Sequence, residues 1–166
     1  MDFKTKWSNC EEKSLYVPEG LWPKTQRQFV FWNYWRIFSR FISKYINRFA
    51  LPNGTIRSLE VGCGRGTISQ YIQKRRKSDV YLVDNDVNAC DVARTNFPDY
   101  HYVSYGDALN LPVKDDFFDL VFSTGLAEHI ANKDINKFYQ EKFRVLKPGG
   151  FMISLNIPKK FSIQFL

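Results

Sequence analysis

The feature that most constrains this chain is an alternation of short apolar runs with helical patterns between residues 56 and 156. Short apolar runs bounded by glycine, proline or aspartate are typical of buried strands, and the longer segments between them have helical spacing. The predicted strands are 56–61, 80–83, 101–105, 118–123 and 151–156, the predicted helices are 67–77, 87–96 and 135–145, and a sharp turn is predicted at 147–150. Strands that alternate with helices form a parallel sheet covered on both faces, so we predict an α/β fold.

The segment before the first strand has a different pattern. Residues 1–24 lack periodicity and are predicted to form an irregular arm, whereas residues 25–49 have helical spacing. The apolar face of this helix comprises Phe38, Phe41, Ile42, Tyr45, Ile46 and Phe49, and a basic stripe comprises Arg36, Arg40, Lys44 and Arg48. A solvated face is the favoured interpretation of the stripe, with docking to acidic lipid or RNA as the alternative. We therefore divide one structural domain into an arm and helix at 1–54 and a core at 55–166.

The composition excludes several classes of protein. Apolar residues make up 44% and charged residues 25% of the chain, as in folded globular proteins rather than disordered ones. No apolar run is long enough to span a bilayer or to form a signal peptide. The three cysteines have neither CxxC nor zinc-ligand spacing, so we predict no metal site and a cytoplasmic protein with reduced thiols. The net charge of +7 favours attraction to anionic surfaces without identifying a partner.

A glycine-rich loop follows the first predicted strand. Gly62, Gly64 and Gly66 alternate, which allows positive-φ backbone and lets a ligand lie against the main chain. The N-terminus of the next helix offers N–H groups to a carboxylate or phosphate. The GxGxG spacing differs from the GxGxxG of dinucleotide-binding folds, which argues against a nicotinamide dehydrogenase.

Acidic residues follow the second and third predicted strands. Asp84 lies about 20 residues after Gly62, the separation at which a strand-end acid accepts hydrogen bonds from ribose hydroxyls. Asp107 follows the third strand, where it is placed to accept from an adenine amino group. Strand-end acids also serve as helix caps, so each signal is weak alone. Together and on one edge of a sheet, they predict a nucleoside-binding crevice.

In four stretches the chain resembles the class I S-adenosylmethionine-dependent methyltransferases, particularly the group that includes ubiquinone and menaquinone biosynthesis enzymes. The stretches are LEVGCGRG at 59–66, YLVDND at 81–86, GDALNLPVKDDFFDLVFSTGLAEHI at 106–130 and FRVLKPGGFMISL at 143–155. The resemblance implies a Rossmann-like, doubly wound sheet of strand order 3-2-1-4-5. It also implies S-adenosylmethionine as the cofactor and methyl transfer as the reaction.

The resemblance assigns roles to individual residues. The cofactor-binding set is Glu60, Gly62, Cys63, Gly64 and Gly66 around the methionine part, Asp84 at the ribose, Asn85, Asp107 and Ala108 at the adenine, and Ser123 and Thr124 near the sulfonium. A general base is needed only for an acceptor that must lose a proton, and His129 or the preceding Glu128 is the candidate. A local hydrogen-bonding role for His129 at the start of a helix is the favoured alternative.

The methyl acceptor is predicted from the end of the fourth strand. Residues 122–126 replace the Asn-Pro-Pro-Tyr motif that is typical of methyltransferases acting on nucleobase amino groups. We therefore predict a small-molecule acceptor, amphipathic in view of the aromatic region 22–35. RNA is the alternative acceptor, because aromatic residues interleaved with Arg and Lys stack bases and pair phosphates.

The C-terminal part departs from the family pattern. Family members continue from the fifth strand into a helix and a final antiparallel strand pair, whereas this sequence stops at Leu166. We expect the family's last two strands to be missing and the edge of the fifth strand to be open to pairing in a dimer or with a partner subunit. A catalytically incomplete S-adenosylmethionine-binding interaction module is the non-enzymatic alternative.

Overall fold

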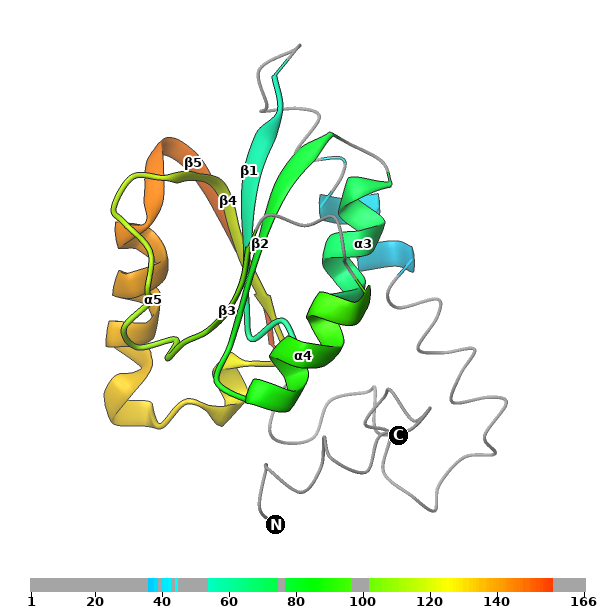
Figure 1. Ribbon diagram of the computed structural model, residues 1–166. Coiled ribbons are helices and arrows are strands. Elements are labelled where there is room, and N and C mark those ends of the chain that lie inside the picture. The colour runs from blue at the N-terminus through cyan, green and yellow to red at the C-terminus, as the bar shows by residue number, and fades with distance from the viewer. Residues whose placement is uncertain are drawn as a thin grey trace, which may run out of the picture.

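The computed structural model describes residues 36–38, 40–42, 44, 54–74, 77–96 and 102–156. At its centre lies a five-stranded parallel sheet with the order β3-β2-β1-β4-β5 (Figure 1). The strands are β1 (Ile56–Val61), β2 (Ser78–Asp84), β3 (Tyr102–Tyr105), β4 (Phe118–Thr124) and β5 (Leu146–Leu155). The predicted α/β class, parallel sheet and strand order are thus confirmed.

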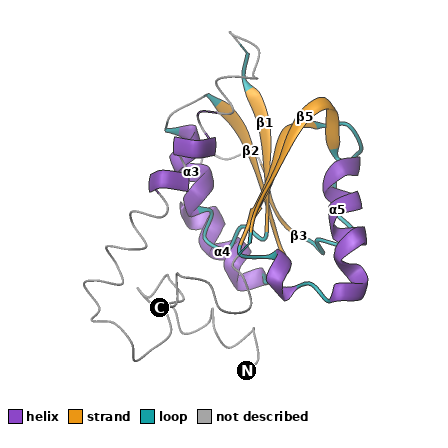
Figure 2. Cartoon of the chain, turned by 180° about the vertical axis from the view of Figure 1, so that it is seen from behind, coloured by secondary structure: helices purple, strands orange, loops and turns teal. Residues whose placement is uncertain are grey.

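Helices cover both faces of the sheet. Helices α3 (Thr67–Gln73) and α4 (Val87–Asn96) lie on one face and α5 (Ile135–Arg144) lies on the other (Figures 1 and 2). Two short 3-10 helices, η1 (Ala127–His129) and η2 (Asn132–Asp134), lead from β4 into α5. Asp86 begins α4 as predicted, because its Oδ1 accepts the Asn88 N–H at 2.8 Å. Helix α3 ends at Gln73, earlier than predicted.

Two apolar layers fill the space between the sheet and its helices. The layer against α5 includes Leu59, Val61, Val83, Phe118, Val121, Phe138 and Val145. The layer against α3 includes Ile56, Ile68, Ile72, Leu120 and Phe122. Leu120 and Val121 are neighbours in β4 and belong to opposite layers. Because both faces of a central parallel strand are buried, its sequence is a continuous apolar run, and such runs made the strands predictable.

A helical segment within residues 36–44 packs beside α3. Phe38 and Ile42 are 6% and 0% exposed and belong to the same buried cluster as Ile68. Phe41, predicted for the same apolar face, is 47% exposed, so the prediction is wrong for this residue. Successive helical residues are rotated by about 100°, which turns position 41 away from the face that carries positions 38 and 42.

Strand β5 begins at Leu146 rather than at Phe151, and the sharp turn predicted at 147–150 is wrong. Phe118 pairs with Leu146, and two residues later Leu120 pairs with Phe151. The extra residues of β5 therefore form a bulge against β4, with Gly149 at a φ of 78°. The ladder then resumes and sets Ser154 opposite Ser123.

Several predicted features lie outside the described residues. They are the arm at 1–24, most of the helix at 25–49, the start of the third strand at His101, and residues 157–166. Among the residues that are described, no helix is long and apolar enough to cross a membrane.

Candidate functional site

The carboxyl ends of β1, β2, β3 and β4 meet along one rim of the sheet, at its lower end in Figure 1. The chain runs outward from β1 through β2 to β3 and then returns to β4 on the other side of β1. In doubly wound sheets ligands bind outside the strand ends where the order reverses in this way. The residues that follow these four strands therefore make up the candidate site.

The loop between β1 and α3 is held in a tight turn by main-chain hydrogen bonds. Gly62, Gly64 and Gly66 have φ values of 71°, 50° and 70°, which residues with a Cβ rarely adopt. The Gly66 N–H donates to the Cys63 carbonyl at 2.8 Å and closes the turn. The N–H groups of Gly62 and Cys63 donate to the Val83 carbonyl at 2.8 and 3.1 Å, which ties the loop to β2.

Packing restricts two residues of this loop further. A Cβ on Gly62 would lie 2.9 Å from Cδ2 of Leu126, so the absence of a side chain lets the loops after β1 and β4 meet. Cys63 is 6% exposed and packs with Val80 and Leu82. Burial raises the pKa of the Cys63 thiol well above its ordinary value. The Cys63 side chain is therefore a packing group, and the place of this residue in the predicted cofactor-binding set stays a prediction.

The Asp84 carboxylate connects the glycine loop to the end of β2. Its Oδ2 accepts the Gly64 N–H at 2.8 Å, and its Oδ1 accepts the Asp86 N–H at 3.0 Å. Burial raises the pKa of Asp84, an effect that these two N–H groups partly offset. Each carboxylate oxygen has a second lone pair, so both can accept a further hydrogen bond from a ligand. Asn85, the next residue, is exposed on the rim.

Glu60 lies behind the glycine loop rather than on its surface. Its side chain is 2% exposed, and Oε2 accepts the Ser69 hydroxyl at 2.6 Å and the Ser69 N–H at 3.3 Å. Gly66 provides no side-chain cap, so Glu60 caps the first turn of α3 from within β1. Burial raises the pKa of Glu60 to about 8. Its predicted place in the wall around the methionine part stays a prediction.

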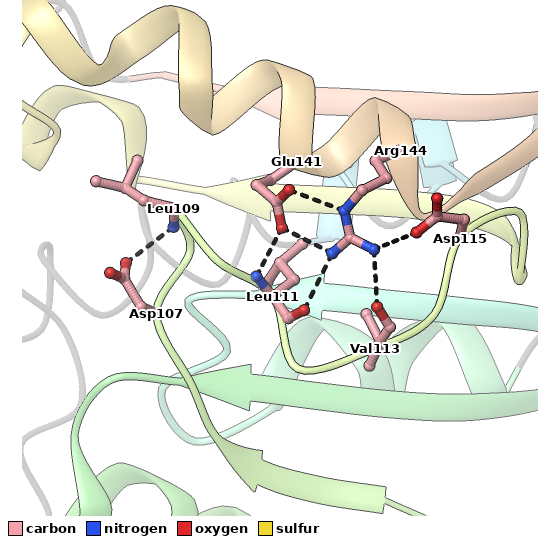
Figure 3. Close-up of polar contacts among 7 residues, drawn as sticks. All are labelled: Asp107, Leu109, Leu111, Val113, Asp115, Glu141 and Arg144. Atoms are coloured by element: carbon pink, nitrogen blue, oxygen red, sulfur yellow. Dashed lines mark hydrogen bonds and ion pairs between the residues drawn. The ribbon is translucent and has the colours of Figure 1, made fainter.

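The loop after β3 is fixed by the C-terminal turn of α5. Arg144 uses its guanidinium N–H groups to bind the Leu111 and Val113 carbonyls and the carboxylates of Asp115 and Glu141. Glu141 also accepts the Leu111 N–H at 2.8 Å (Figure 3). The hydrogen bond from Arg144 lowers the pKa of Glu141, so this carboxylate stays ionised. A rigid anchor thus holds the segment that carries the predicted adenine contacts.

Asp107 and Ala108 begin this anchored loop. The Asp107 carboxylate is exposed, and its Oδ1 accepts the Leu109 N–H at 2.8 Å. The Asp107 carbonyl accepts the Asn110 N–H at 3.0 Å and closes a turn. The other carboxylate oxygen, Oδ2, belongs to an exposed side chain in a constrained loop and can accept a further hydrogen bond.

At the end of β4, Ser123 and Thr124 lie in different environments. Ser123 is 0% exposed, and its Oγ accepts a hydrogen bond from Lys142 Nζ at 2.9 Å. Lys142 also donates to Ser154 Oγ at 2.6 Å and to the Ile153 carbonyl at 3.3 Å. The Ser123 hydroxyl is therefore buried against α5. The predicted approach of this residue to the sulfonium stays a prediction. Thr124 is the residue of the pair that lies at the strand end and is partly exposed.

Glu128 and His129 follow on η1. His129 is exposed and is the last residue of this 3-10 helix rather than the first residue of a helix. Oε2 of Glu128 is buried and has no hydrogen-bond partner among the described residues, and the same is true of Asp86 Oδ2. Both oxygens therefore have lone pairs that can accept a hydrogen bond from a ligand.

The groups on the rim fit S-adenosylmethionine. The side chains offer mainly carboxylate oxygens, from Asp84, Asp86, Asp107 and Glu128, and the glycine loop offers bare main chain. The cofactor carries a positive sulfonium, an ammonium, two ribose hydroxyls and an adenine amino group, all of which suit carboxylate acceptors. No group of three or more His, Cys, Asp or Glu suited to a metal ion occurs in the part of the chain that is described, so the carboxylates do not form a cluster of that kind.

Lys142 and Arg144 are structural residues that the sequence did not reveal in advance. Lys142 lies four residues after Phe138 and three before Val145, on the apolar face of α5. A lysine at such a position was the available signal for a buried ammonium. No comparable signal marked the anchoring of the loop by Arg144, because its partners in that loop lie about 30 residues away.

Comparison with known proteins gives one family. Residues 59–154 match the family described as methyltransferase domain. The chain is 32% identical over 111 residues to a ubiquinone/menaquinone biosynthesis C-methyltransferase of Vibrio vulnificus, covering 62% of this chain and 42% of that protein.

Two solved structures extend the comparison. An S-adenosylmethionine-dependent methyltransferase from Clostridium acetobutylicum superposes with a TM-score of 0.64 at 21% identity, over 72% of this chain and 49% of that one. A phosphoethanolamine N-methyltransferase of Haemonchus contortus, solved with S-adenosyl-L-methionine, gives a TM-score of 0.56 at 27% identity, over 65% of this chain and 26% of that one. The chain spans about two fifths of the length of the curated relatives it matches.

Proposed function

Because this chain belongs to the methyltransferase domain family, we propose that its rim binds S-adenosylmethionine and that the protein methylates a small-molecule acceptor. When bound, the cofactor supplies an activated methyl group to a nucleophilic O, N, C or S atom placed in line with it. The residues of the chain then have to bind the cofactor and the acceptor, align their reacting atoms and exclude water.

The observation that carries the proposal is the hydrogen bond from the Gly64 N–H to Asp84 Oδ2 at 2.8 Å. This hydrogen bond holds the main chain of the glycine loop next to the Asp84 carboxylate, whose oxygens can each accept a further hydrogen bond. We assign the ribose hydroxyls to Asp84, the adenine to Asn85, Asp107 and Ala108, and the methionine part to the main chain of residues 62–66. Glu60 supports this loop from behind by capping α3.

The acceptor side is assigned to the loop after β4. Thr124, Glu128 and His129 are polar residues there, and we propose that Glu128 Oε2, which has no hydrogen-bond partner among the described residues, accepts a proton or a hydrogen bond from an acceptor. His129 remains the candidate general base for an acceptor whose hydroxyl must be deprotonated.

A small molecule is favoured over RNA because of the charge on the rim. Carboxylates of Asp84, Asp86, Asp107 and Glu128 repel a phosphate backbone, whereas RNA binding depends on cations that neutralise it. The relative from Vibrio vulnificus, named for ubiquinone and menaquinone biosynthesis, supports an acceptor of the small-molecule class.

We also propose a partner strand at the edge of β5, in a dimer or with another subunit. Among the described residues, β5 pairs with β4 on one side only. Phe143 and Met152, 70% and 39% exposed, add apolar surface on α5 and β5. We assign the protein to the cytoplasm because Cys63 and Cys90 are free thiols, as a reducing compartment maintains.

Calorimetry with S-adenosylhomocysteine tests the cofactor assignment. Asp84→Ala is expected to weaken binding by about 10-fold to 100-fold, because a hydrogen bond to a charged group contributes roughly 1.5 to 3 kcal/mol. Asp84→Asn keeps one acceptor oxygen and should lose less, and Asp91→Ala, on the exposed surface of α4, is the matched control. An unchanged dissociation constant for Asp84→Ala would contradict the assignment. Binding of NAD without binding of S-adenosylhomocysteine would contradict it as well.

Transfer of radiolabelled methyl groups tests the acceptor. The protein is incubated with methyl-labelled S-adenosylmethionine and with phenols, quinols, amines, fatty acids or RNA at equal concentration. We expect the label to be transferred to one of the small molecules. Label found in RNA alone refutes the acceptor class, and tight cofactor binding without transfer to any acceptor supports an interaction module instead.

A further inference from the structure

The helical segment within residues 36–44 has an outer face that the proposed function does not use. Its inner face carries Phe38 and Ile42, which are buried against the layer that includes Ile68 and Ile72. Its outer face carries Ile37 and Phe41, which are 64% and 47% exposed although both are large apolar side chains. Solvent-exposed apolar residues that are grouped in this way mark interaction surfaces more often than isolated ones do.

Two cations share this outer face with the apolar residues. Ile37 and Phe41 are one turn apart, as are Arg40 and Lys44, and all four side chains are exposed. At 100° per residue, positions 37, 40, 41 and 44 fall within an arc of about 100°, so they form one continuous stripe. Among these four residues there is no acidic side chain.

The composition of the stripe suits one kind of partner. From these four residues we infer that the outer face docks on an anionic lipid surface, with Ile37 and Phe41 entering the acyl boundary and Arg40 and Lys44 binding the headgroups. Long cationic side chains extend toward a polar interface while neighbouring apolar groups are buried. All four residues can therefore contact the same membrane surface at once. The net charge of +7 adds long-range attraction to the same surface.

Nucleic acid matches this stripe less well. Single-stranded RNA is bound by rings that stack on successive bases, and the stripe offers one ring, Phe41, beside an aliphatic Ile37. The aliphatic side chain contributes to membrane insertion but contributes nothing to base stacking. An anionic lipid surface is therefore the partner that these four residues favour.

Co-sedimentation of the full chain with vesicles tests this inference. Vesicles of phosphatidylcholine with about one third phosphatidylserine are compared with vesicles of phosphatidylcholine alone, in low salt. Since each cation near an anionic surface contributes roughly five-fold in partitioning, the variant Arg40→Gln/Lys44→Gln should bind about 25-fold more weakly. Lys133→Gln/Lys137→Gln, which removes two exposed cations from the α5 side, is the control of equal charge and should bind nearly as wild type.

A second variant separates insertion from charge. Ile37→Ser/Phe41→Ser should lose binding at both low and high salt, whereas the loss caused by Arg40→Gln/Lys44→Gln should shrink as salt rises. Circular dichroism and S-adenosylhomocysteine binding confirm that each variant is folded. Equal loss in the control pair, equal binding to both vesicle types, or a loss of RNA binding with vesicle binding unchanged would each overturn the inference.

Discussion

Among the described residues, one face of the sheet buries a carboxyl group and the other buries an amine. Under α3, the Glu60 carboxyl accepts two hydrogen bonds from Ser69, and burial raises its pKa to about 8. Under α5, the Lys142 amine donates to three oxygens, including those of Ser123 and Ser154, and burial lowers its pKa to about 7. Both shifts favour the neutral form, as expected for a charge removed from water without a counter-ion.

Glu60 and Lys142 differ in the structural elements that their hydrogen bonds connect. Glu60 joins β1 to the first turn of α3 directly behind the glycine loop, so its hydrogen bonds support the proposed cofactor site. Lys142 joins α5 to two strands away from that loop, and its partners are neutral. A perturbed pKa alone therefore does not identify a functional site in this protein. The elements that the side chain connects are the better guide.

Removal of Glu60 is expected to have the largest effect. Glu60→Leu leaves the buried N–H and hydroxyl of Ser69 without their acceptor, which should lower the free energy of unfolding by about 3 kcal/mol. Urea denaturation at pH 6 measures this change. Glu60→Gln keeps an acceptor oxygen and should lose less than about 1 kcal/mol. Equal losses in the two variants would mean that the hydrogen bonds to Ser69 do not matter.

Removal of Lys142 is expected to have a smaller effect of the opposite sign. Lys142→Met fills a similar volume without a buried ammonium, and replacing buried charges by apolar residues often stabilises by about 1 to 4 kcal/mol, so we expect a gain of about 2 kcal/mol at pH 6. Thermal denaturation measures it, with exposed Lys137→Met as the control. A loss of stability in Lys142→Met would show that its three hydrogen bonds outweigh the desolvation of the amine.

The pH dependence of stability provides the most specific test, with the smallest change over any one pH unit. The folded pKa of Glu60, about 8, is above its ordinary value of 4.5, so its contribution is complete below pH 4.5 and is lost as the pH rises to 8. The folded pKa of Lys142, about 7, is below its ordinary value of 10.5. The unfolded chain therefore binds the extra proton between pH 7 and 10.5, and stability rises over that range.

Together the two residues contribute a minimum of stability between pH 7 and 8, with slopes of roughly 1 kcal/mol per pH unit on each side. Glu60→Gln should remove the acid-side slope and Lys142→Met the alkaline-side slope, as followed by denaturation across this range. If neither variant changes its slope, both side chains have ordinary pKa values in the folded protein.

Local spacing was sufficient to predict the parts of the molecule that depend on neighbours in sequence. The glycine loop, the strand-end position of Asp84 and the Asp86 cap of α4 follow from residues a few positions apart or from the βαβ repeat. The parallel order of the strands was expected from the resemblance to a known family and is confirmed.

Contacts between distant segments were not predictable in the same way. The burial of the Ser123 hydroxyl depends on Lys142, and the fixed loop after β3 depends on Arg144, both on a helix that comes later in the chain. The bulge that moved the start of β5 to Leu146 depends on its register with β4, which no local pattern encodes. Side-chain roles at the site therefore required the tertiary structure.

The most direct test of the central claim is a titration of the ¹⁵N-labelled protein with S-adenosylhomocysteine, followed by amide chemical shifts. The account predicts saturable shifts at Gly62, Gly64 and Gly66, at Asp84 and Asn85, and at Asp107 and Ala108, with Lys142 and its neighbours on α5 little changed. Saturation without shifts at Gly64 and Asp84, or shifts confined to α5, would contradict the placement of the cofactor on this rim.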